Sequence, residues 1–247
     1  MNIIVLMKRV PDLVEDLEVD DSGKQLDGEY LKFTLNEFDD HALEEGLLLK
    51  EATGGRLTVA AVDGEDVDKM LFTALAKGAD RGLKVTGVEA GDSTRALAEI
   101  LRQVVAQDSY DLVLTGVQAA DDRDGQLAPT LAALLEMPSV EVVTGVTPGA
   151  GHVTLHKEYS GGTVAEFEVD LPAVIGIQAA RQAPRYAPVS KVRQVQQSST
   201  LETLSAAAAP GEGFAVVEMT PPETGAGAQM LDGVEELMAV LDSKGVV

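Results

Sequence analysis

The sequence predicts an α/β fold, a doubly wound and mostly parallel sheet with an antiparallel extension and a C-terminal arm. Three observations indicate it. Short apolar runs alternate with helical patterns over the first two-thirds of the chain, period-two runs follow Pro138, and no sustained periodicity follows Arg185. Continuous apolar runs such as LTVAAV and LVLTG are typical of parallel strands that are covered on both faces.

The alternating part contains four predicted strands and four predicted helices. The apolar runs predict strands at 3–7, 57–62, 83–85 and 112–115, and the helical patterns predict helices at 38–51, 66–77, 94–106 and 127–135. An acidic segment between Pro11 and Leu35 predicts a hairpin around Ser22 and Gly23. A loop inserted there projects from the end of the sheet where ligands bind.

After Pro138 the pattern predicts antiparallel strands. The runs are VEVVTGV, HVTLHKEY, TVAEFEVDL and AVIGIQA, joined by the turn-like PGAG and SGG. From Arg185 the chain is polar and rich in small residues, so we expect an arm without a core of its own. Residues 230–242 place apolar side chains on one helical face, which predicts a helix that docks either on this chain or on another.

Composition excludes several classes of function. The chain has 247 residues, 45% of them hydrophobic, and a net charge of -22, which opposes binding to nucleic acid or to anionic membranes. It has no cysteine and no apolar stretch of the roughly 20 residues that a membrane helix needs. The N-terminus is typical of a strand and not of a signal peptide, so we expect a cytoplasmic protein. Because there is no cysteine, a cysteine zinc site is excluded, and we expect no metal site.

The segment 111–135 is the main candidate for a ligand site. A strand run ends at Gly116, an acidic loop follows, and a helical pattern begins near Leu127. Ligands of open α/β sheets lie at the carboxyl ends of the strands, where helix N-termini present free amides. The alternative is an ordinary crossover whose helix is capped by Asp121, Asp122 or Asp124. Because these carboxylates repel a phosphate, binding requires that they point away and that backbone amides near Gly125 make the contact.

Six blocks, in order along the chain, carry a resemblance to a known family. They are MKRVPD at 7–12, NEFDDHALEEGLLLKE at 36–51, TALAKGADRG at 73–82, GVQAADDRDGQLAPTLAALL at 116–135, LPAV at 171–174 and APRYA at 183–187. Together they resemble the β subunit of electron transfer flavoprotein over roughly the first 190 residues. The resemblance implies a fold similar to that of adenine-nucleotide α-hydrolases, divided into a nucleotide-binding domain at 1–188 and a recognition loop, arm and docking helix at 189–247.

The resemblance also implies a function. A β subunit of this family forms a heterodimer with an α subunit that carries most of the redox FAD, and it buries a structural AMP. Electrons arrive from acyl-CoA or other flavin dehydrogenases and leave to a quinone reductase or similar acceptor, so no catalytic side chain is expected. The residues implied at the AMP are Leu6, Asn36, Phe38, Asp39, Asp63, Gly116, Val117, Gln118, Ala119, Ala120, Asp121, Asp122, Arg123, Asp124, Gly125, Gln126 and Leu127.

Further residues are implied at the partner surfaces. Glu158 matches a family glutamate that contacts the mobile flavin domain, and otherwise it is an exposed strand residue. Val189 or Val192 is the expected anchor that enters a groove on the dehydrogenase. His41 reads as an ordinary helix residue, Asn36 alternatively as a helix cap and Phe38 alternatively as core.

Departures from the family pattern leave the cofactor open. Val117 stands where the family has a lysine, so a cation near the nucleotide is lost. Bifurcating members of the family hold a second FAD in place of AMP, and Pro129 matches the proline in their loop. Asp122 stands where their loop has a glycine, and its larger side chain favours AMP over a flavin. The sequence therefore leaves three functions: an electron carrier with AMP, which we favour, a bifurcating carrier with a second FAD, and a stand-alone adenine-nucleotide module.

Overall fold

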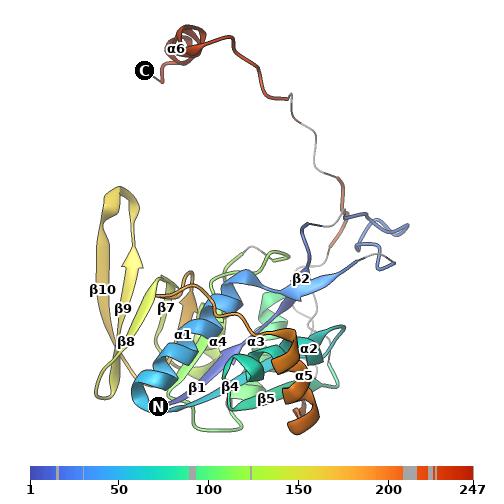
Figure 1. Ribbon diagram of the computed structural model, residues 1–247, viewed down its shortest axis with the longest axis vertical. Coiled ribbons are helices and arrows are strands. Elements are labelled where there is room, and N and C mark those ends of the chain that lie inside the picture. The colour runs from blue at the N-terminus through green and yellow to red at the C-terminus, as the bar shows by residue number, and fades with distance from the viewer. Residues whose placement is uncertain are drawn as a thin grey trace.

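The computed structural model describes residues 1–14, 17–29, 31–88, 93–122, 124–207, 216–221, 225 and 227–246. Its centre is a seven-stranded sheet in the order β12-β5-β4-β1-β6-β11-β7 (Figure 1). All of its strand pairs are parallel. The strands are β1 (Asn2–Leu6), β4 (Arg56–Val62), β5 (Arg81–Thr86), β6 (Leu112–Gly116), β7 (Ser139–Val143), β11 (Ala173–Ile177) and β12 (Glu202–Ser205).

Helices cover both faces of this sheet, as the sequence predicts. They are α1 (Glu37–Thr53) and α2 (Val67–Lys77) on one face, and α3 (Thr94–Val105) and α4 (Leu127–Leu135) on the other. Along β1 the buried side chains alternate: Ile3 and Val5 pack toward α1, and Ile4 and Leu6 pack toward α3 and α4. The apolar run of β1 is therefore continuous because both faces are covered.

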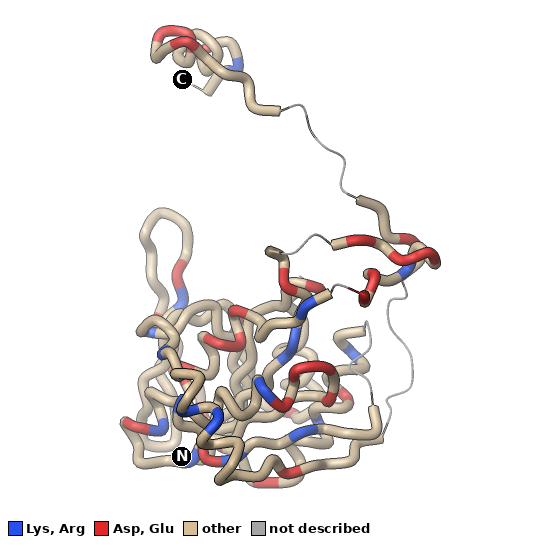
Figure 2. Tube along the Cα trace, turned by 45° about the vertical axis from the view of Figure 1, so that its right-hand side comes forward, with Lys and Arg blue, Asp and Glu red and all other residues tan. Residues whose placement is uncertain are grey.

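The predicted hairpin lies between β1 and α1. Its root is the antiparallel pair β2 (Arg9–Pro11) and β3 (Phe33–Leu35), and farther out Val19 bridges Leu26. The turn contains Gly23 at φ +67, a conformation that glycine adopts without the steric cost of a side chain. Acidic residues gather along the hairpin (Figure 2).

The antiparallel extension is smaller than the sequence predicts. A three-stranded sheet contains β8 (Gly145–Pro148), β9 (His152–Glu158) and β10 (Val164–Asp170), and the SGG segment forms the turn η1 (Ser160–Gly162). The prediction is wrong for VEVV and AVIGI, because β7 and β11 pair in parallel in the main sheet. β11 is buried along its whole length between β6 and β7, and its unbroken apolar run indicates a central strand.

The expectation of an irregular arm is wrong for the residues just after 188. They form α5 (Val189–Ser198), which packs on α2, and β12, which pairs with β5 at the sheet edge. Leu201 packs where a side chain at Gly82 would have to sit, with its Cδ2 2.7 Å from an ideal Cβ there. The domain boundary at 188 stays a prediction.

The last described segment contains α6 (Val234–Ser243), a helix that overlaps the predicted range of 230–242 and ends one residue beyond it. Figure 1 shows it away from the sheet, and its apolar residues Val234 and Met238 are exposed. Across the described ranges, none of the helices combines the length and the apolar character that crossing a membrane requires.

Candidate functional site

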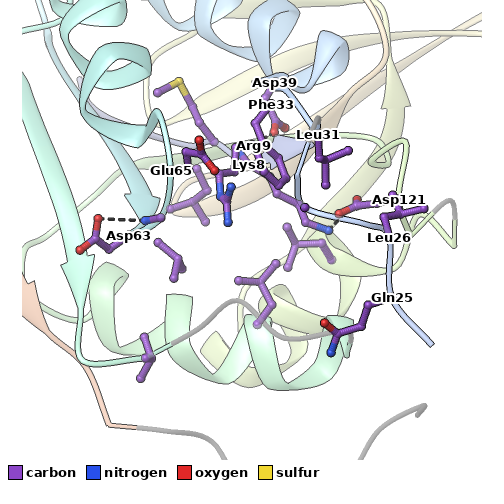
Figure 3. A pocket seen from close by; sticks show the side chains of 18 of the residues that line it. Lys8, Arg9, Gln25, Leu26, Leu31, Phe33, Asp39, Asp63, Glu65 and Asp121 are labelled. Atoms are coloured by element: carbon purple, nitrogen blue, oxygen red, sulfur yellow. Dashed lines mark hydrogen bonds and ion pairs between the residues drawn. The ribbon is translucent and has the colours of Figure 1, made fainter. Parts of the chain in front are cut away.

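A cavity of about 900 Å³ opens at the carboxyl ends of β1, β4, β5 and β6 (Figure 3). Residues that follow β1 and β4 form one side, α3 and α4 contribute leucines, and the hairpin closes the outer side. Five of the residues predicted at the nucleotide line the cavity: Leu6, Asp39, Asp63, Asp121 and Leu127. The crevice thus lies where the strand order predicts it.

Asp39 joins three elements beneath this cavity. It lies in the first turn of α1, and its carboxylate accepts hydrogen bonds from the backbone N–H of Lys8 (2.8 Å) and of Gly116 (2.7 Å). Burial raises the pKa of the Asp39 carboxyl to about 7, against the lowering effect of these bonds. One side chain therefore ties the ends of β1 and β6 to the start of α1.

Gly116 allows this close approach of α1. A Cβ at Gly116 would lie 2.5 Å from Oδ1 of Asp39 and 2.7 Å from the Cβ of Phe38. Phe38 is half-buried next to this contact and does not line the cavity. The glycine that ends β6 is thus needed for helix packing, and its N–H is already used by Asp39.

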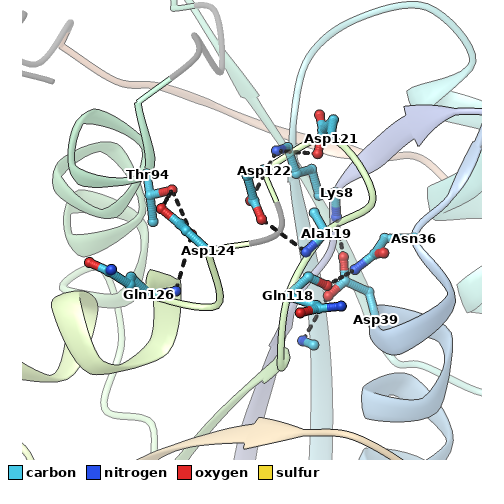
Figure 4. Close-up of polar contacts among 11 residues, drawn as sticks. Lys8, Asn36, Asp39, Thr94, Gln118, Ala119, Asp121, Asp122, Asp124 and Gln126 are labelled. Atoms are coloured by element: carbon cyan, nitrogen blue, oxygen red, sulfur yellow. Dashed lines mark hydrogen bonds and ion pairs between the residues drawn. The ribbon is translucent and has the colours of Figure 1, made fainter. Parts of the chain in front are cut away.

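Asn36 occupies the N-cap position just before α1 but does not cap the helix with its side chain. Its Nδ2 donates to the carbonyl of Gln118 at 2.8 Å, which fastens the loop 117–126 to the start of α1 (Figure 4). The N–H of Val117 donates to the carbonyl of Ile177 at 2.9 Å, so the loop is also fixed to β11. The capping interpretation of Asn36 is therefore wrong.

Lys8 forms ion pairs with two of the loop aspartates and offsets one of their two charges. Its Nζ lies 2.8 Å from Oδ1 of Asp121 and 3.3 Å from Oδ2 of Asp122, whose other oxygen accepts from the N–H of Ala119 (Figure 4). Burial alone lowers the pKa of Lys8, but the hydrogen bond and charge of Asp121, together with Asp122, raise it overall. Sequence reasoning missed Lys8, although the need to offset three aspartates and its place directly after β1 were signals.

Asp124 is the aspartate closest to α4. Its carboxylate accepts from the N–H of Gln126 (3.2 Å) and from Oγ1 of Thr94 (3.1 Å), while Gln126 occupies the N-cap position without a side-chain bond. Gly125, at φ +63, turns the chain just before it. Ala120 does not line the cavity, and Arg123 lies outside the described residues.

Arg9 is a second cation that sequence reasoning missed. Its guanidinium stacks over the ring of Phe33, 3.9 Å from the centroid, and a Cβ at Gly64 would lie 2.6 Å from its Nε. The Nη1 of Arg9 is buried, and among the described residues it has no hydrogen-bond partner. A buried donor in the wall of a cavity fits a ligand that brings acceptor atoms.

The other predicted residues lie elsewhere on the molecule. Glu158 is exposed at the end of β9, beside the η1 turn. Val189 is 59% exposed at the start of α5, and Val192 is partly buried one turn later. His41 has a structural contact, because its Nδ1 accepts from the N–H of Ala180 at 3.2 Å.

Two buried glutamates of α1 hold the segment that leads to α5. Glu45 is fully buried and accepts from the N–H of Val146 (2.9 Å) and from Nε of Arg181 (2.7 Å). Glu44 accepts from Nε (3.0 Å) and Nη2 (2.8 Å) of Arg185, and the hydrogen bonds of Arg185 with Glu51 and with Glu44 raise the pKa of the arginine. Two of the six sequence blocks thus meet in one ion pair, a tertiary contact that spacing along the chain does not reveal.

Comparison with known proteins identifies the family. Residues 25–210 match the model of the electron transfer flavoprotein domain. The chain is 34% identical to the electron transfer flavoprotein subunit beta of Methylophilus methylotrophus over 78% of this chain and 75% of the relative. It is 33% identical to the electron transfer flavoprotein subunit beta of Syntrophomonas wolfei over 95% of this chain and 92% of the relative. It is 32% identical to the mitochondrial electron transfer flavoprotein subunit beta of Oryza sativa subsp. indica over 96% of each chain. The resemblance in the sequence is confirmed, and the chain belongs to the electron transfer flavoprotein β-subunit family.

Proposed function

We propose that this chain is the β subunit of a heterodimeric electron transfer flavoprotein and that its cavity holds a structural AMP. The observation that carries the proposal is the chemistry of the cavity wall. Leu97, Leu101 and Leu127 offer apolar surface to a flat base, and Asp63 offers a carboxylate that can accept ribose hydroxyls. Arg9 adds a buried donor that has no acceptor within the part of the chain that the structure describes.

The loop 117–126 supplies the phosphate end of the proposed site. Lys8 pairs with Asp121 and Asp122 and offsets one of their two charges, which weakens the repulsion between these carboxylates and the phosphate. The remaining attraction comes from backbone amides at the start of α4, whose helix dipole favours an anion. These residues bind and orient a ligand, and none of them is assigned a catalytic step.

The redox chemistry belongs to an FAD shared with an α subunit, which supplies one-electron and hydride steps when bound. In this proposal Glu158 contacts the mobile flavin domain, and Val189 or Val192 enters the dehydrogenase. Donors are flavin dehydrogenases of the acyl-CoA type, and the acceptor is a quinone reductase or similar protein. The proposed compartment is the cytoplasm, and the role is that of an electron carrier without substrate turnover of its own.

A second FAD in place of AMP is the alternative that one observation favours. The cavity of about 900 Å³ is at the upper end of the size range of small-molecule sites, which leaves room for more than a mononucleotide. The carboxylates of Asp63 and Glu65 along its wall count against additional phosphates.

Cofactor counting tests these proposals. The chain is co-expressed with its α subunit, the purified complex is denatured, and the released cofactors are quantified. One FAD and one AMP per heterodimer is the expected result. Two FAD molecules and no AMP would contradict the AMP proposal and support the alternative with a second FAD. A chain that forms no complex and releases no flavin would contradict both and support a stand-alone nucleotide-binding module.

The recognition residues are tested separately. Replacing Val189 and Val192 together by aspartate should abolish electron transfer with the dehydrogenase, because a charge cannot enter an apolar groove without a desolvation cost. Flavin content should stay at the wild-type level. Val246→Asp, at an exposed valine near the C-terminus, is the matched control. Unchanged transfer in the double variant would contradict the assignment.

A further inference from the structure

The outer wall of the cavity is built from two segments that are far apart in the sequence. Lys24, Gln25 and Leu26 come from the hairpin, and Met219 comes from the C-terminal segment 216–221. These four residues line one side of the cavity, and Leu6 lines the inner side that faces them. Figure 1 shows the C-terminal segment running beside the hairpin. None of these wall residues belongs to the sequence blocks that mark the family.

The hairpin is ordered by its own hydrogen bonds. The N–H of Asp20 donates to Gln25 at 2.9 Å, and the N–H of Asp27 donates to Glu18 at 2.8 Å. At the root, the N–H of Asp12 donates to the carbonyl of Lys32 at 2.9 Å, next to the short pair of β2 and β3. The hairpin is therefore a preformed flap that joins the body through a narrow root.

One backbone bond joins the tip of this flap to the C-terminal segment. The N–H of Met219 donates to the carbonyl of Gly23 at 2.7 Å, a length typical of a well-formed bond. The side chain of Met219 is partly buried and lines the cavity, whereas its neighbours Val217 and Glu218 are exposed. Met219 therefore contacts both the flap and the cavity.

We propose that Met219 is a latch that holds the hairpin over the nucleotide, so that the C-terminal segment sets how fast the nucleotide leaves. The proposal rests on the function proposed above, in which this cavity holds AMP. A nucleotide held by Leu6 and Asp63 would face the hairpin and, from the loop 117–126, Asp121 across the cavity. The loop is fixed at Asn36 and Ile177, so the hairpin is the movable wall.

The size of the effect follows from the single bond. A hydrogen bond between partly exposed backbone groups shifts an equilibrium by about fivefold. Loss of the Met219 bond should therefore raise the rate of AMP release by about fivefold. The rate of AMP binding should change less, because the pocket itself is retained.

The test uses a proline that removes the donor. Heterodimers of wild type, Met219→Pro, Met219→Ala and Glu218→Pro are loaded with radiolabelled AMP and chased with unlabelled AMP. Met219→Pro should release the label about fivefold faster. Met219→Ala keeps the backbone N–H and should change the rate of AMP release less. Glu218→Pro introduces a proline next to Met219 while the N–H of Met219 stays intact, so its rate of AMP release should equal that of wild type. FAD content and thermal unfolding confirm that each variant folds.

A second readout does not depend on the nucleotide. Because the chain has no cysteine, Leu26→Cys places a single thiol of this subunit in the cavity wall. Maleimide labelling of that position, located by peptide mass spectrometry, should be about fivefold faster when combined with Met219→Pro. Wild-type release and labelling rates in Met219→Pro, or equal effects of the two prolines, would overturn the latch. Absence of AMP from the wild-type heterodimer would instead overturn the proposed function.

Discussion

Removing the guanidinium of Arg185 should strongly destabilise the protein. The carboxylate of Glu44 is 2% exposed and accepts three side-chain hydrogen bonds at 2.8–3.0 Å from Arg185. In Arg185→Met the backbone N–H of residue 185 still reaches Glu44, at 2.9 Å, but the buried charge loses its counterion. Breaking a buried pair from one side costs about 3–5 kcal/mol. The contact of Arg185 with Glu51, which is exposed, adds little.

Differential scanning calorimetry of the purified heterodimer measures this cost. For a chain of this size the loss corresponds to a fall of roughly 10 °C in Tm. The second substitution Glu44→Gln should restore part of it, because a neutral amide is cheaper to bury than an unpaired carboxylate. Arg193→Met, at an exposed arginine of α5, is the matched control and should stay within about 2 °C. An Arg185→Met variant that melts with the control would refute the reasoning.

Three further predictions concern the cavity. Lys8→Met should weaken AMP binding about tenfold in isothermal titration calorimetry, because Asp121 is left uncompensated beside the phosphate, and equal affinity would contradict the role of Lys8. Gly116→Ala should lower the free energy of unfolding in urea melts by about 2 kcal/mol or more through overpacking against Asp39, while Gly28→Ala, which meets nothing within 4 Å, should change it little. The pKa of Asp39 is raised from 3.8 to about 7, so the folded state binds the proton of this carboxyl more tightly than the unfolded state does. The stability that this group contributes is therefore fully present below about pH 4 and is lost as the pH rises through 7. Urea melts from pH 4 to 8 should thus show wild type losing stability relative to Asp39→Asn, and parallel curves would contradict it.

The parts of the fold that could be predicted are those with a local signal. Buried strands such as β1 and β4 are continuous apolar runs, and α3 has a strongly one-sided pattern beginning at a serine cap, Ser93. β12 could not be predicted, since its sequence ETLS is mostly exposed and its strand conformation depends on pairing with β5. β7 and β11 lie next to antiparallel strands in the sequence, but they pair with each other in parallel within the main sheet, and this pairing is a long-range contact that the local pattern does not show.

The candidate site divides in the same way. Residues at strand ends, such as Leu6 and Asp63, could be placed because parallel strands end at one edge. Met219 could not, because its role depends on a partner far along the chain, Gly23. For Lys8 the sequence held a signal in the acidic loop, but the pairing with Asp121 itself is a long-range contact. Hydrogen bonds of this kind leave no periodicity in the sequence.

The buried carboxylates of α1 have a consequence for the order of folding. Glu44 and Glu45 have their partners at Arg185 and Arg181, 141 and 136 residues later in the chain. Until those arginines are available, docking α1 on the sheet would bury two charges without counterions, and the desolvation of unpaired carboxylates is costly. We therefore expect α1 to dock only after the far end of the sheet has emerged during synthesis, and folding of this domain to be slow and dominated by non-local contacts. A nascent chain that stops before Arg181 should keep α1 undocked even though its strand partners β1 and β4 are complete.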